Sequence, residues 1–462
     1  MSVDRVPDNI GAWLVNDLAH GDRKTPYSFV AAVPPEFTEI GEDEILRAAS
    51  GDEALSIVEQ FGADIIVTNH DLALSDLALG EPAALADLEA FFVDETMSGR
   101  ARAEIPRALV GVPTQAAVDL LLKHLAMEHP YHRFEVLKAL GKLRAGGAPL
   151  DFDESAVSRQ IALESGRYFK LAGVMSLLPT GRPEADLLCR AIGETQQMRL
   201  ESVFRLLGLL YPARDVLNAY HGVMSGRRVL RANAQEFLDN LLTGRHRRLV
   251  LSLIDEQPAT EAWLEAAVSL GFDPGGEIRT REEALDFLAS GADPWLCACA
   301  MFAGATNTGG PAAHFLDKSG ADMLSPIEKV LVLQKVDVFS EVPTAQLAAL
   351  AGIAREVSVM ADEDIYREHD SPDALYLVLE GSVKLHQGER LITMAGRLTP
   401  FGTWALFDEE PRVMTATAAE DSRLMRIDRD EFIDLLSDEV RIAQGIIKTV
   451  AGRLRELADR VS

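Results

Sequence analysis

Cysteine is scarce in this chain. Its 462 residues include only Cys189, Cys297 and Cys299. Three cysteines without framework spacing cannot build a disulfide scaffold, so we expect a reducing, cytoplasmic setting. Cys297 and Cys299 lie in an apolar run, and no further ligands follow at matching spacing. Buried small hydrophobic side chains therefore explain this pair better than a metal site does.

Basic residues and long apolar runs are also lacking. The chain has 45 Lys and Arg against 72 Asp and Glu, a formal net charge of −27. Because nonspecific nucleic-acid binding relies on basic surface, this balance argues against a nucleic-acid partner. No run of about 18 apolar residues is present, which predicts no membrane span. The first residues are polar and acidic, which predicts no secretory signal.

Known catalytic motifs are missing as well. The sequence contains no P-loop, no kinase glycine loop and no zincin helix, so we expect a protein that is not an enzyme and needs no cofactor. What is present is an ordinary globular composition, 47% apolar and 25% charged. The length suffices for two to four domains.

Residues 1–100 form an N-terminal arm followed by a poorly defined, mostly helical segment. Four prolines break the first 40 residues, where we expect a short helix at Ile10 to Leu18 and a strand or extended arm at Tyr27 to Val33. Helices are predicted at 42–50, 52–61 and 83–92, with a buried strand at 63–69. The stretch faintly resembles half of a response-regulator receiver domain, with Asn69 in place of the phosphate-accepting Asp. A working receiver, a degenerate relic and a plain helical segment are the alternatives, and the last is favoured.

Residues 101–322 carry a persistent helical period. Apolar residues recur at i, i+3, i+4 and i+7, as in Val118, Leu121, Leu122 and Leu125. Helices are expected at 106–110, 115–126, 133–144, 154–178, 184–210, 213–224, 230–242, 248–254, 260–269, 280–290 and 294–304.

Two stretches in this region, 117–144 and 281–305, repeat one pattern: a helix, a charged break with Pro, and a second helix rich in Ala and Leu. Such pairs bury their apolar faces by stacking on neighbours. The pattern resembles HEAT-type repeats and implies an α-solenoid with a protein partner on its surface. Other segments, including "RYFKLAGVMSLL", resemble the soluble helical region of bacterial ATP/ADP-translocase-like proteins. That resemblance implies an association with a membrane transporter.

Residues 307–311, "NTGGP", are the clearest linker candidate. A connecting helix follows within 323–340, at Pro326 to Leu333. Beyond it, in 341–462, the period changes to short strands separated by turns, which predicts a small antiparallel jelly-roll barrel with flanking helices. Strands are expected at 357–360, 365–367, 375–379, 382–386, 389–394, 415–419 and 422–427, and helices at 430–436 and 441–461.

A glycine and an arginine ten residues apart stand between strands of this barrel. Gly402 lets backbone approach a ligand closely, and successive N–H groups at a turn form a nest for phosphate. Arg412 can supply a forked and permanently charged donor. This arrangement predicts an anion site.

From about Leu333 to Leu457 the chain resembles the cyclic-nucleotide-binding domain. The matching motifs are "LQKVDVF" at 333–339, "EHDS" at 368–371, "LYLVLEGSV" at 375–383, the phosphate-binding cassette at 400–415, and "IDRDEF" at 427–432. The resemblance implies cAMP or cGMP as ligand and 441–461 as a lid helix over the base. The cassette residues that it implies are Phe401, Gly402, Thr403, Trp404, Ala405, Arg412, Val413 and Thr415.

The cassette departs from the family pattern at two positions. Thr403 stands where the family has the Glu that accepts from the ribose 2′-hydroxyl, and Val413 stands where a small residue usually follows the arginine. Trp404 is expected either to fill part of the pocket or to pack into the barrel, and packing is favoured.

Two weaker clusters complete the candidates. His124, His129 and His132 gather at a helix junction, where a solvated or capping role is favoured over a metal site. Arginines at 227, 228, 231, 245, 247 and 248, with His246, form the only basic concentration. A solvated face is favoured there over a docking site for an acidic partner or phosphate.

Two functions follow from these observations. The first is a non-enzymatic regulatory protein for signal transduction, in which the cyclic-nucleotide-binding-type domain is coupled to a helical-repeat scaffold. The alternative is a scaffold whose degenerate nucleotide pocket binds no cyclic nucleotide. No helix-turn-helix follows the barrel, so a transcription factor is not expected.

Overall fold

The computed structural model describes residues 3–5, 13–20, 23–30, 89, 105–125, 130–255, 261–306, 310, 312–318, 320 and 323–461. The chain divides into two compact units, residues 1–167 with 199–256 and residues 168–198 with 257–462. The helices α8 (Glu154–Met175) and α9 (Pro183–Leu210) each run from one unit into the other. This division into two units does not test the domain boundaries predicted from the sequence, which stay a prediction.

The N-terminal segment contains an antiparallel three-stranded sheet in the order β1-β2-β3. Its strands are β1 (Val3–Arg5), β2 (Trp13–His20) and β3 (Arg23–Val30). The short helix predicted at 10–18 is therefore wrong, because β2 pairs with β3 from Trp13 opposite Val30 to His20 opposite Arg23. A helix of nine residues is marginal alone, and strand pairing satisfies the same backbone groups. The elements and the receiver resemblance predicted for 42–92 lie outside the described residues, apart from the helical Glu89.

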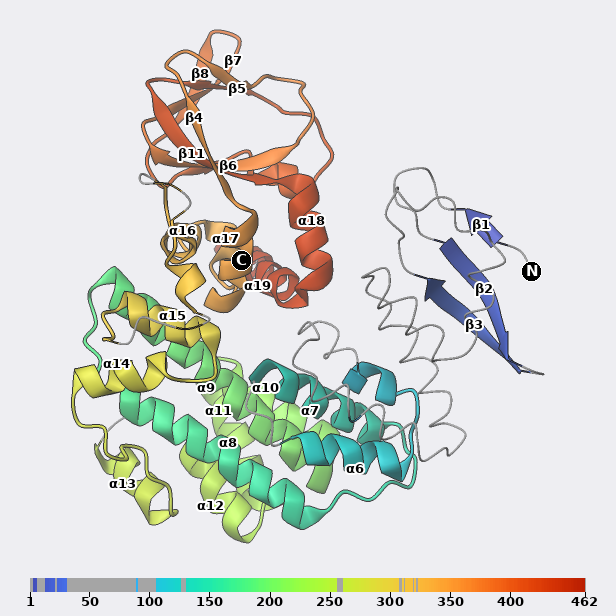
Figure 1. Ribbon diagram of the computed structural model, residues 1–462. Helices are drawn as coiled ribbons and strands as arrows, with labels where there is room; N and C mark the ends of the chain where they lie inside the picture. The colour runs from blue at the N-terminus through green and yellow to red at the C-terminus, as the bar shows by residue number, and fades with distance from the viewer. Residues whose placement is uncertain are drawn as a thin grey trace. The chain divides into compact units, whose positions relative to one another are not determined.

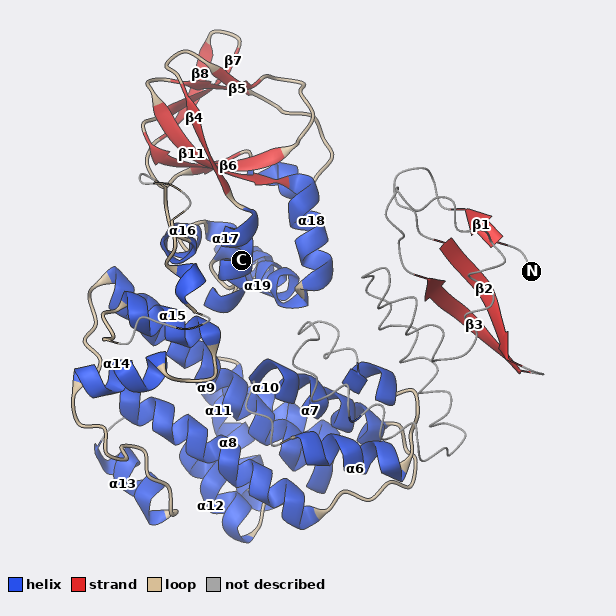
Figure 2. Cartoon of the chain, in the orientation of Figure 1, coloured by secondary structure: helices blue, strands red, loops and turns tan. Residues whose placement is uncertain are grey.

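Helices dominate the region that follows, as predicted (Figures 1 and 2). Residues 105–109 are helical. After them come α6 (Gln115–His124), α7 (Pro130–Ala145), α8, α9, α10 (Ala213–Met224), α11 (Arg228–Leu241), α12 (Gly244–Leu253), α13 (Glu261–Ser269), α14 (Arg281–Ala289) and α15 (Pro294–Phe302). Local chemistry sets the ends: Thr280 and Glu283 form a capping box before α14, and Asp293 caps α15 ahead of a proline. No helix in the described ranges has both the length and the apolar content that crossing a membrane requires.

Both stretches that repeat one pattern form the expected helix pairs. The first gives the neighbouring helices α6 and α7, and the second gives α14 and α15. Helix length varies widely between elements, from 9 residues in α15 to 28 in α9. A region rich in helices is confirmed, and a solenoid of HEAT-like repeats stays a prediction.

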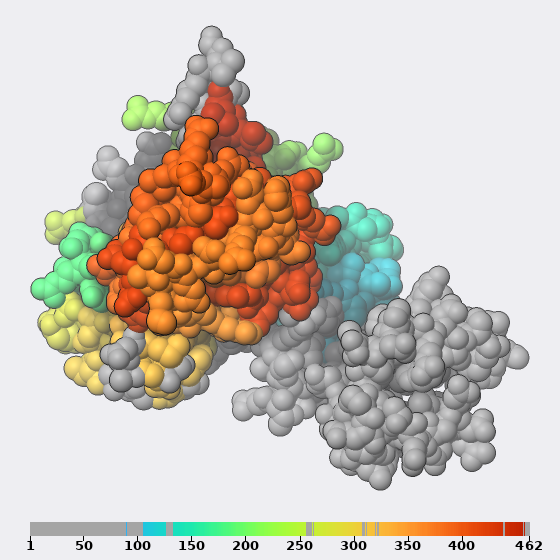
Figure 3. Space-filling view, turned by 90° about the horizontal axis from the view of Figure 1, so that it is seen from above, coloured from blue at the N-terminus to red at the C-terminus, as the bar shows by residue number. Residues whose placement is uncertain are grey.

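The C-terminal part is an antiparallel barrel of two four-stranded sheets, as predicted. One sheet has the order β5-β10-β7-β8 and the other β4-β11-β6-β9. The strands are β4 (Arg355–Val359), β5 (Asp364–Tyr366), β6 (Ala374–Glu380), β7 (Val383–Gln387), β8 (Arg390–Ala395), β9 (Pro400–Phe401), β10 (Thr415–Ala418) and β11 (Ser422–Asp428). Figure 3 shows the molecule from above, where the atoms of this C-terminal part form a continuous surface in orange and red.

Helices flank the barrel in sequence. They are α16 (Pro326–Leu333), the 3₁₀-helix η3 (Asp337–Phe339), α17 (Thr344–Ile353), α18 (Arg429–Asp438) and α19 (Val440–Val461). Helices α16, α18 and α19 were expected from the sequence, and α17 was not. Seven of the ten residues of α17 are apolar, and its polar Thr344 and Gln346 are buried as well, so it shows no amphipathic period.

Strand β6 is buried on both faces. Tyr376 and Val378 point into the barrel core, whereas Leu375, Leu377 and Leu379 belong to a second core. Alternate residues of a strand point to opposite faces, so one strand serves both cores.

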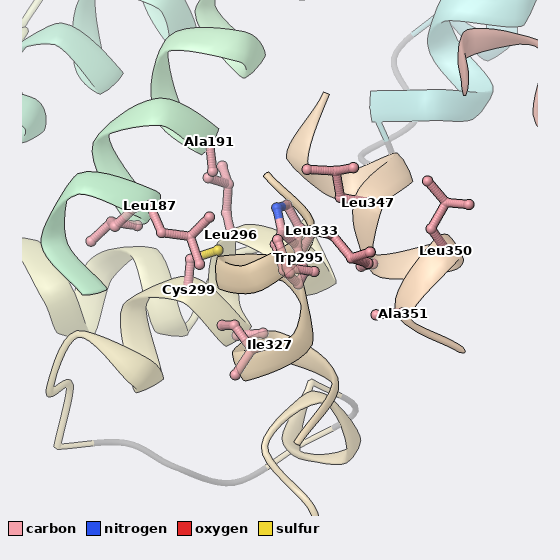
Figure 4. Close-up of a cluster of buried hydrophobic side chains, with 14 of the residues drawn as sticks. Leu187, Ala191, Trp295, Leu296, Cys299, Ile327, Leu333, Leu347, Leu350 and Ala351 are labelled. Carbon is pink, nitrogen blue, oxygen red and sulfur yellow. The ribbon is translucent and has the colours of Figure 1, made fainter. Parts of the chain in front are cut away.

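The second core joins the barrel to the helices of the same unit. It runs from α9 through α14, α15, α16 and α17 to β6, β11, α18 and α19. Figure 4 shows Leu187 and Ala191 of α9 close to Leu296 and Cys299 of α15, with Leu333 of α16 and Leu347 of α17 beside them. Cys297 and Cys299 are buried, and burial raises the pKa of both thiols. The linker candidate at 307–311 lies outside the described residues except Gly310, and the helices on its two sides share this core.

Candidate ligand site

The cassette turn begins at the end of β9. Gly402 has a left-handed backbone with φ of 68°, and the 3₁₀-helix η4 (Thr403–Leu406) follows it. A Cβ at this position would lie 2.6 Å from Nη1 of Arg412 and 3.3 Å from the carbonyl oxygen of Ala374. Both the backbone angle and the close approach of the arginine therefore require glycine.

Arg412 points inward from the loop before β10 and is 6% exposed. Its Nη2 donates to Asp373 Oδ1 at 2.8 Å and to the Ala374 carbonyl at 2.7 Å. Its Nη1 donates to the Gly402 carbonyl at 3.3 Å. The predicted glycine and arginine therefore meet in space, and a carboxylate already occupies part of the guanidinium fork.

An aromatic cluster lies on one side of this arginine. Its guanidinium lies 4.1 Å from the ring centroid of Tyr366. Tyr376 and Phe401 stack with 5.4 Å between centroids and 13° between planes. Burial raises the pKa of Tyr366 to about 12 despite the nearby Arg412. These rings belong to the apolar core of the barrel.

Asp373 connects the cassette to the helix that follows the barrel. Its second carboxylate oxygen accepts from Arg426 Nη2 at 3.2 Å. Arg426 also donates from Nε to Asp428 Oδ1 at 2.6 Å. The carbonyl of Asp373 accepts from the N–H of Arg429, the first residue of α18, at 2.8 Å. One residue therefore contacts the cassette arginine, strand β11 and the start of α18.

A polar hollow of about 540 Å³ adjoins Asp373. It is lined by Arg355, Ser371, Pro372, Asp373, Glu409, Arg426, Asp428, Arg429, Asp430 and Glu431. Neither Arg412 nor residues 401–405 line it. Its arginines are engaged with neighbouring carboxylates: Arg355 with Glu431, Arg426 with Asp373 and Asp428, and Arg429 with Glu409.

The remaining predicted cassette residues differ in exposure. Phe401 and Ala405 are buried, and the Ala405 N–H already donates to the Gly402 carbonyl at 3.0 Å. Thr403 is half-buried. Thr415 begins β10, and its hydroxyl accepts from the Glu368 N–H at 3.1 Å. Their role in ligand binding stays a prediction.

Trp404 and Val413 lie on the surface, 80% and 65% exposed. The expectation that Trp404 packs into the barrel is therefore wrong. It stands on the outer side of the short η4 turn, whose buried side is taken by Ala405 and Leu406.

The sequence pattern did not indicate Asp373, Tyr366 or Arg426 as partners in this site, although all three lie in or beside predicted strands. The Ser-Pro-Asp turn at 371–373 was the available signal, since Pro and Asp mark a turn whose carboxylate can reach back to the barrel.

The weaker clusters give no metal site among the residues that the structure describes. His124 is buried, and that burial lowers the pKa of its imidazole despite the nearby Glu89. His129 lies outside the described residues, and within those described no group of His, Cys, Asp or Glu is arranged to hold a metal ion. In the basic region Arg247 pairs with Asp239, and Arg231 donates to the Ile254 carbonyl at 2.7 Å.

The C-terminal part of the chain is similar to known proteins. The family model of the cyclic nucleotide-binding domain matches residues 356–439. The CRP-like cAMP-activated global transcriptional regulator of Mycobacterium tuberculosis is 28% identical over 129 residues, which is 27% of this chain and 58% of that protein. The cyclic AMP receptor protein of Thermus thermophilus is 35% identical over 97 residues, 20% of this chain and 45% of that protein.

Among solved structures, the N-terminal domain of a transcriptional regulator from Streptomyces coelicolor A3(2) is 29% identical, with a TM-score of 0.27. It aligns over 28% of this chain and 95% of its own. The chain spans little more than half the length of the Mycobacterium relative. Residues 356–439 therefore match the cyclic nucleotide-binding domain, and this part of the chain is similar to CRP-like regulators.

Proposed function

We propose that this chain is a non-enzymatic regulatory protein of the cytoplasm. Its cyclic nucleotide-binding domain takes cAMP or cGMP at the cassette and is coupled to a helical scaffold for a protein partner. The contact that carries this proposal is the buried Arg412 fork, which reaches the Gly402 turn at 3.3 Å. A buried guanidinium beside a glycine turn offers a phosphate both charge and direction.

Binding at this site requires an exchange of partners. The cyclic phosphate would take the place of the Asp373 carboxylate on Arg412, because both are anions that compete for the same N–H groups. Asp373 would then keep Arg426, to which it is already bonded. The Thr403 hydroxyl would meet the ribose with a neutral hydrogen bond instead of a charged one.

The same exchange would carry the signal out of the barrel. The carbonyl of Asp373 holds the first N–H of α18, and α19 follows directly. A shift of Asp373 would therefore alter how α18 and α19 meet the barrel. Ligand drives such a change only as far as it binds one state better than the other.

A scaffold without a cyclic nucleotide is the second candidate. The observation that favours it is the same ion pair: Asp373 already satisfies Arg412, and Thr403 and Val413 depart from the family pattern. In this case the ion pair would be a permanent part of the barrel.

Calorimetry with cAMP and cGMP separates the two candidates. We expect wild-type protein to bind one of them, and Arg412→Ala to weaken binding about 10- to 100-fold, since it removes a charge-assisted hydrogen bond. The exposed Arg397 provides the control, and Arg397→Ala should bind like the wild type. Wild-type binding weaker than about 1 mM would support the scaffold instead. Binding that survives Arg412→Ala would place the ligand elsewhere.

A further inference from the structure

Helix α9 presents three residues on one stripe to the C-terminal domain. Arg190, Glu194 and Met198 are spaced four residues apart, so they lie on one face of the helix. They contact residues 334–344 and the start of α19, all within one compact unit.

Arg190 holds the turn that precedes α17. Its Nη2 donates to the Val342 carbonyl at 2.8 Å and to the Ser340 carbonyl at 3.2 Å. Its Nη1 donates to the side chain of Gln334, the C-cap residue that follows α16, at 3.3 Å. Its Nε is bonded to Glu194 Oε1 at 2.9 Å, which fixes the two side chains to each other.

Glu194 caps α17 from outside the helix. Its Oε2 accepts from the N–H of Thr344 at 2.7 Å and from the Thr344 hydroxyl at 2.6 Å. Pro343, the residue at the usual capping position, makes no such side-chain bond. The Thr344 hydroxyl also accepts from Trp295 Nε1 at 2.9 Å. A carboxylate at a helix N-terminus satisfies free N–H groups and the helix dipole, so Glu194 supplies what Pro343 lacks.

Helix α19 also contacts the turn that precedes α17. A Cβ added at Gly445 would lie 2.7 Å from the Cα of Val342, so the two backbones are closely packed. Lys448 pairs with Glu341, and Arg453 pairs with Asp337 at 2.9 Å. Arg441 near the start of α19 lies 3.7 Å from the Met198 sulfur on α9. Segment 337–344 is therefore bonded both to α19 and to α9.

We propose that Arg190 and Glu194 form a latch by which α9 holds segment 340–344 and responds to movements of α19. Because the turn is bonded on both sides, a displacement of α19 has to strain or release the contacts on α9. The latch itself rests only on these contacts, and its response to ligand rests on the function proposed above.

Hydrogen–deuterium exchange on the full chain tests the latch, with a matched control on the same helix. Arg205 and Glu201 form another i,i+4 pair on α9, with side chains 27% and 24% exposed against 29% and 26% for Arg190 and Glu194. Without ligand, Glu194→Ala should speed exchange of the Thr344 amide about tenfold, through loss of its cap. Glu201→Ala should leave it unchanged. If the Thr344 amide of Glu194→Ala exchanges at the wild-type rate, the proposed latch is wrong. Should that variant fail to fold, Glu194→Gln keeps an acceptor without the charge and should give a smaller rise.

Saturating cAMP tests the response. In wild type and Glu201→Ala, cAMP should change exchange along residues 184–198, and Glu194→Ala should lose that change. If calorimetry shows that cAMP binds and residues 184–198 do not respond, the coupling is wrong while the function stands. If no cyclic nucleotide binds, the function fails, and the measurement without ligand still decides the latch.

Discussion

Arg412 is the central residue of the candidate ligand site in the C-terminal domain. It is buried against the ring of Tyr366, and its charge is balanced by Asp373 at 2.8 Å. A buried guanidinium without an anion would be costly, so the site always needs one negative partner. In this structure that partner is a protein carboxylate, and the proposed function replaces it with a phosphate.

The position of Thr403 yields a prediction about affinity. Thr403→Glu should tighten cAMP binding about 10- to 100-fold, because a carboxylate accepts a stronger hydrogen bond from the ribose 2′-hydroxyl. Calorimetry with 2′-deoxy-cAMP is the control, since that ligand lacks the hydroxyl and should gain nothing. An equal gain for both ligands would show that residue 403 does not face the ribose.

At this scale the sequence predicted the meeting of Gly402 and Arg412, because a glycine–arginine spacing is a local pattern. It did not predict Asp373 as the arginine's partner, since that pairing joins residues 39 apart in sequence. The sequence also did not predict that Trp404 is exposed. Which side of a four-residue 3₁₀ turn faces outward depends on how Ala405 and Leu406 pack.

Elements were predicted where their period was clear. The helices from α6 to α15 and the strands from β4 to β11, apart from the two-residue β9, lie within a few residues of their predicted bounds. Two of the misses have physical causes. The residues of β2 form a strand of a sheet instead of the predicted short helix. In α17 most residues are apolar and buried, so the sequence shows no single apolar helical face.

Two glycines of α19 make a prediction about stability. Gly445→Ala should lower the melting temperature, because its Cβ would meet the Val342 Cα at 2.7 Å and the Glu341 carbonyl at 2.8 Å. Gly452 has nothing within 4 Å of its added Cβ. Gly452→Ala should therefore raise the melting temperature, since alanine favours a helix by about 1 kcal/mol over glycine. Differential scanning calorimetry measures both, and a rise in both variants would refute the close packing of α19.

Over the whole molecule, the barrel and part of the helical region share a core. The sequence indicated a linker at 307–311, because Gly and Pro mark breaks. It could not show that α15 and α9 pack with α16 and α17 on the other side of that break. Contacts between residues far apart in sequence follow from the assembled core and leave no local pattern.

This shared core predicts that the C-terminal domain is weakened when cut out. A fragment of residues 323–462 loses Leu187, Ala191, Trp295 and Leu296 from its core. Each fully buried large apolar side chain contributes about 1.5–3 kcal/mol, so the fragment should melt below the full chain and bind a hydrophobic dye. A fragment of 257–462 keeps α15 and should lie between the two. Equal melting of the shortest fragment and the full chain would show an independent domain.

The central claim is that Arg412 exchanges Asp373 for a ligand phosphate. Its most direct test is the affinity of Asp373→Asn for cAMP, measured by calorimetry beside the wild type at one ionic strength. Asparagine keeps the shape but removes the competing charge, so we predict binding about tenfold tighter than in wild type. Binding that is unchanged or weaker in Asp373→Asn would contradict the exchange.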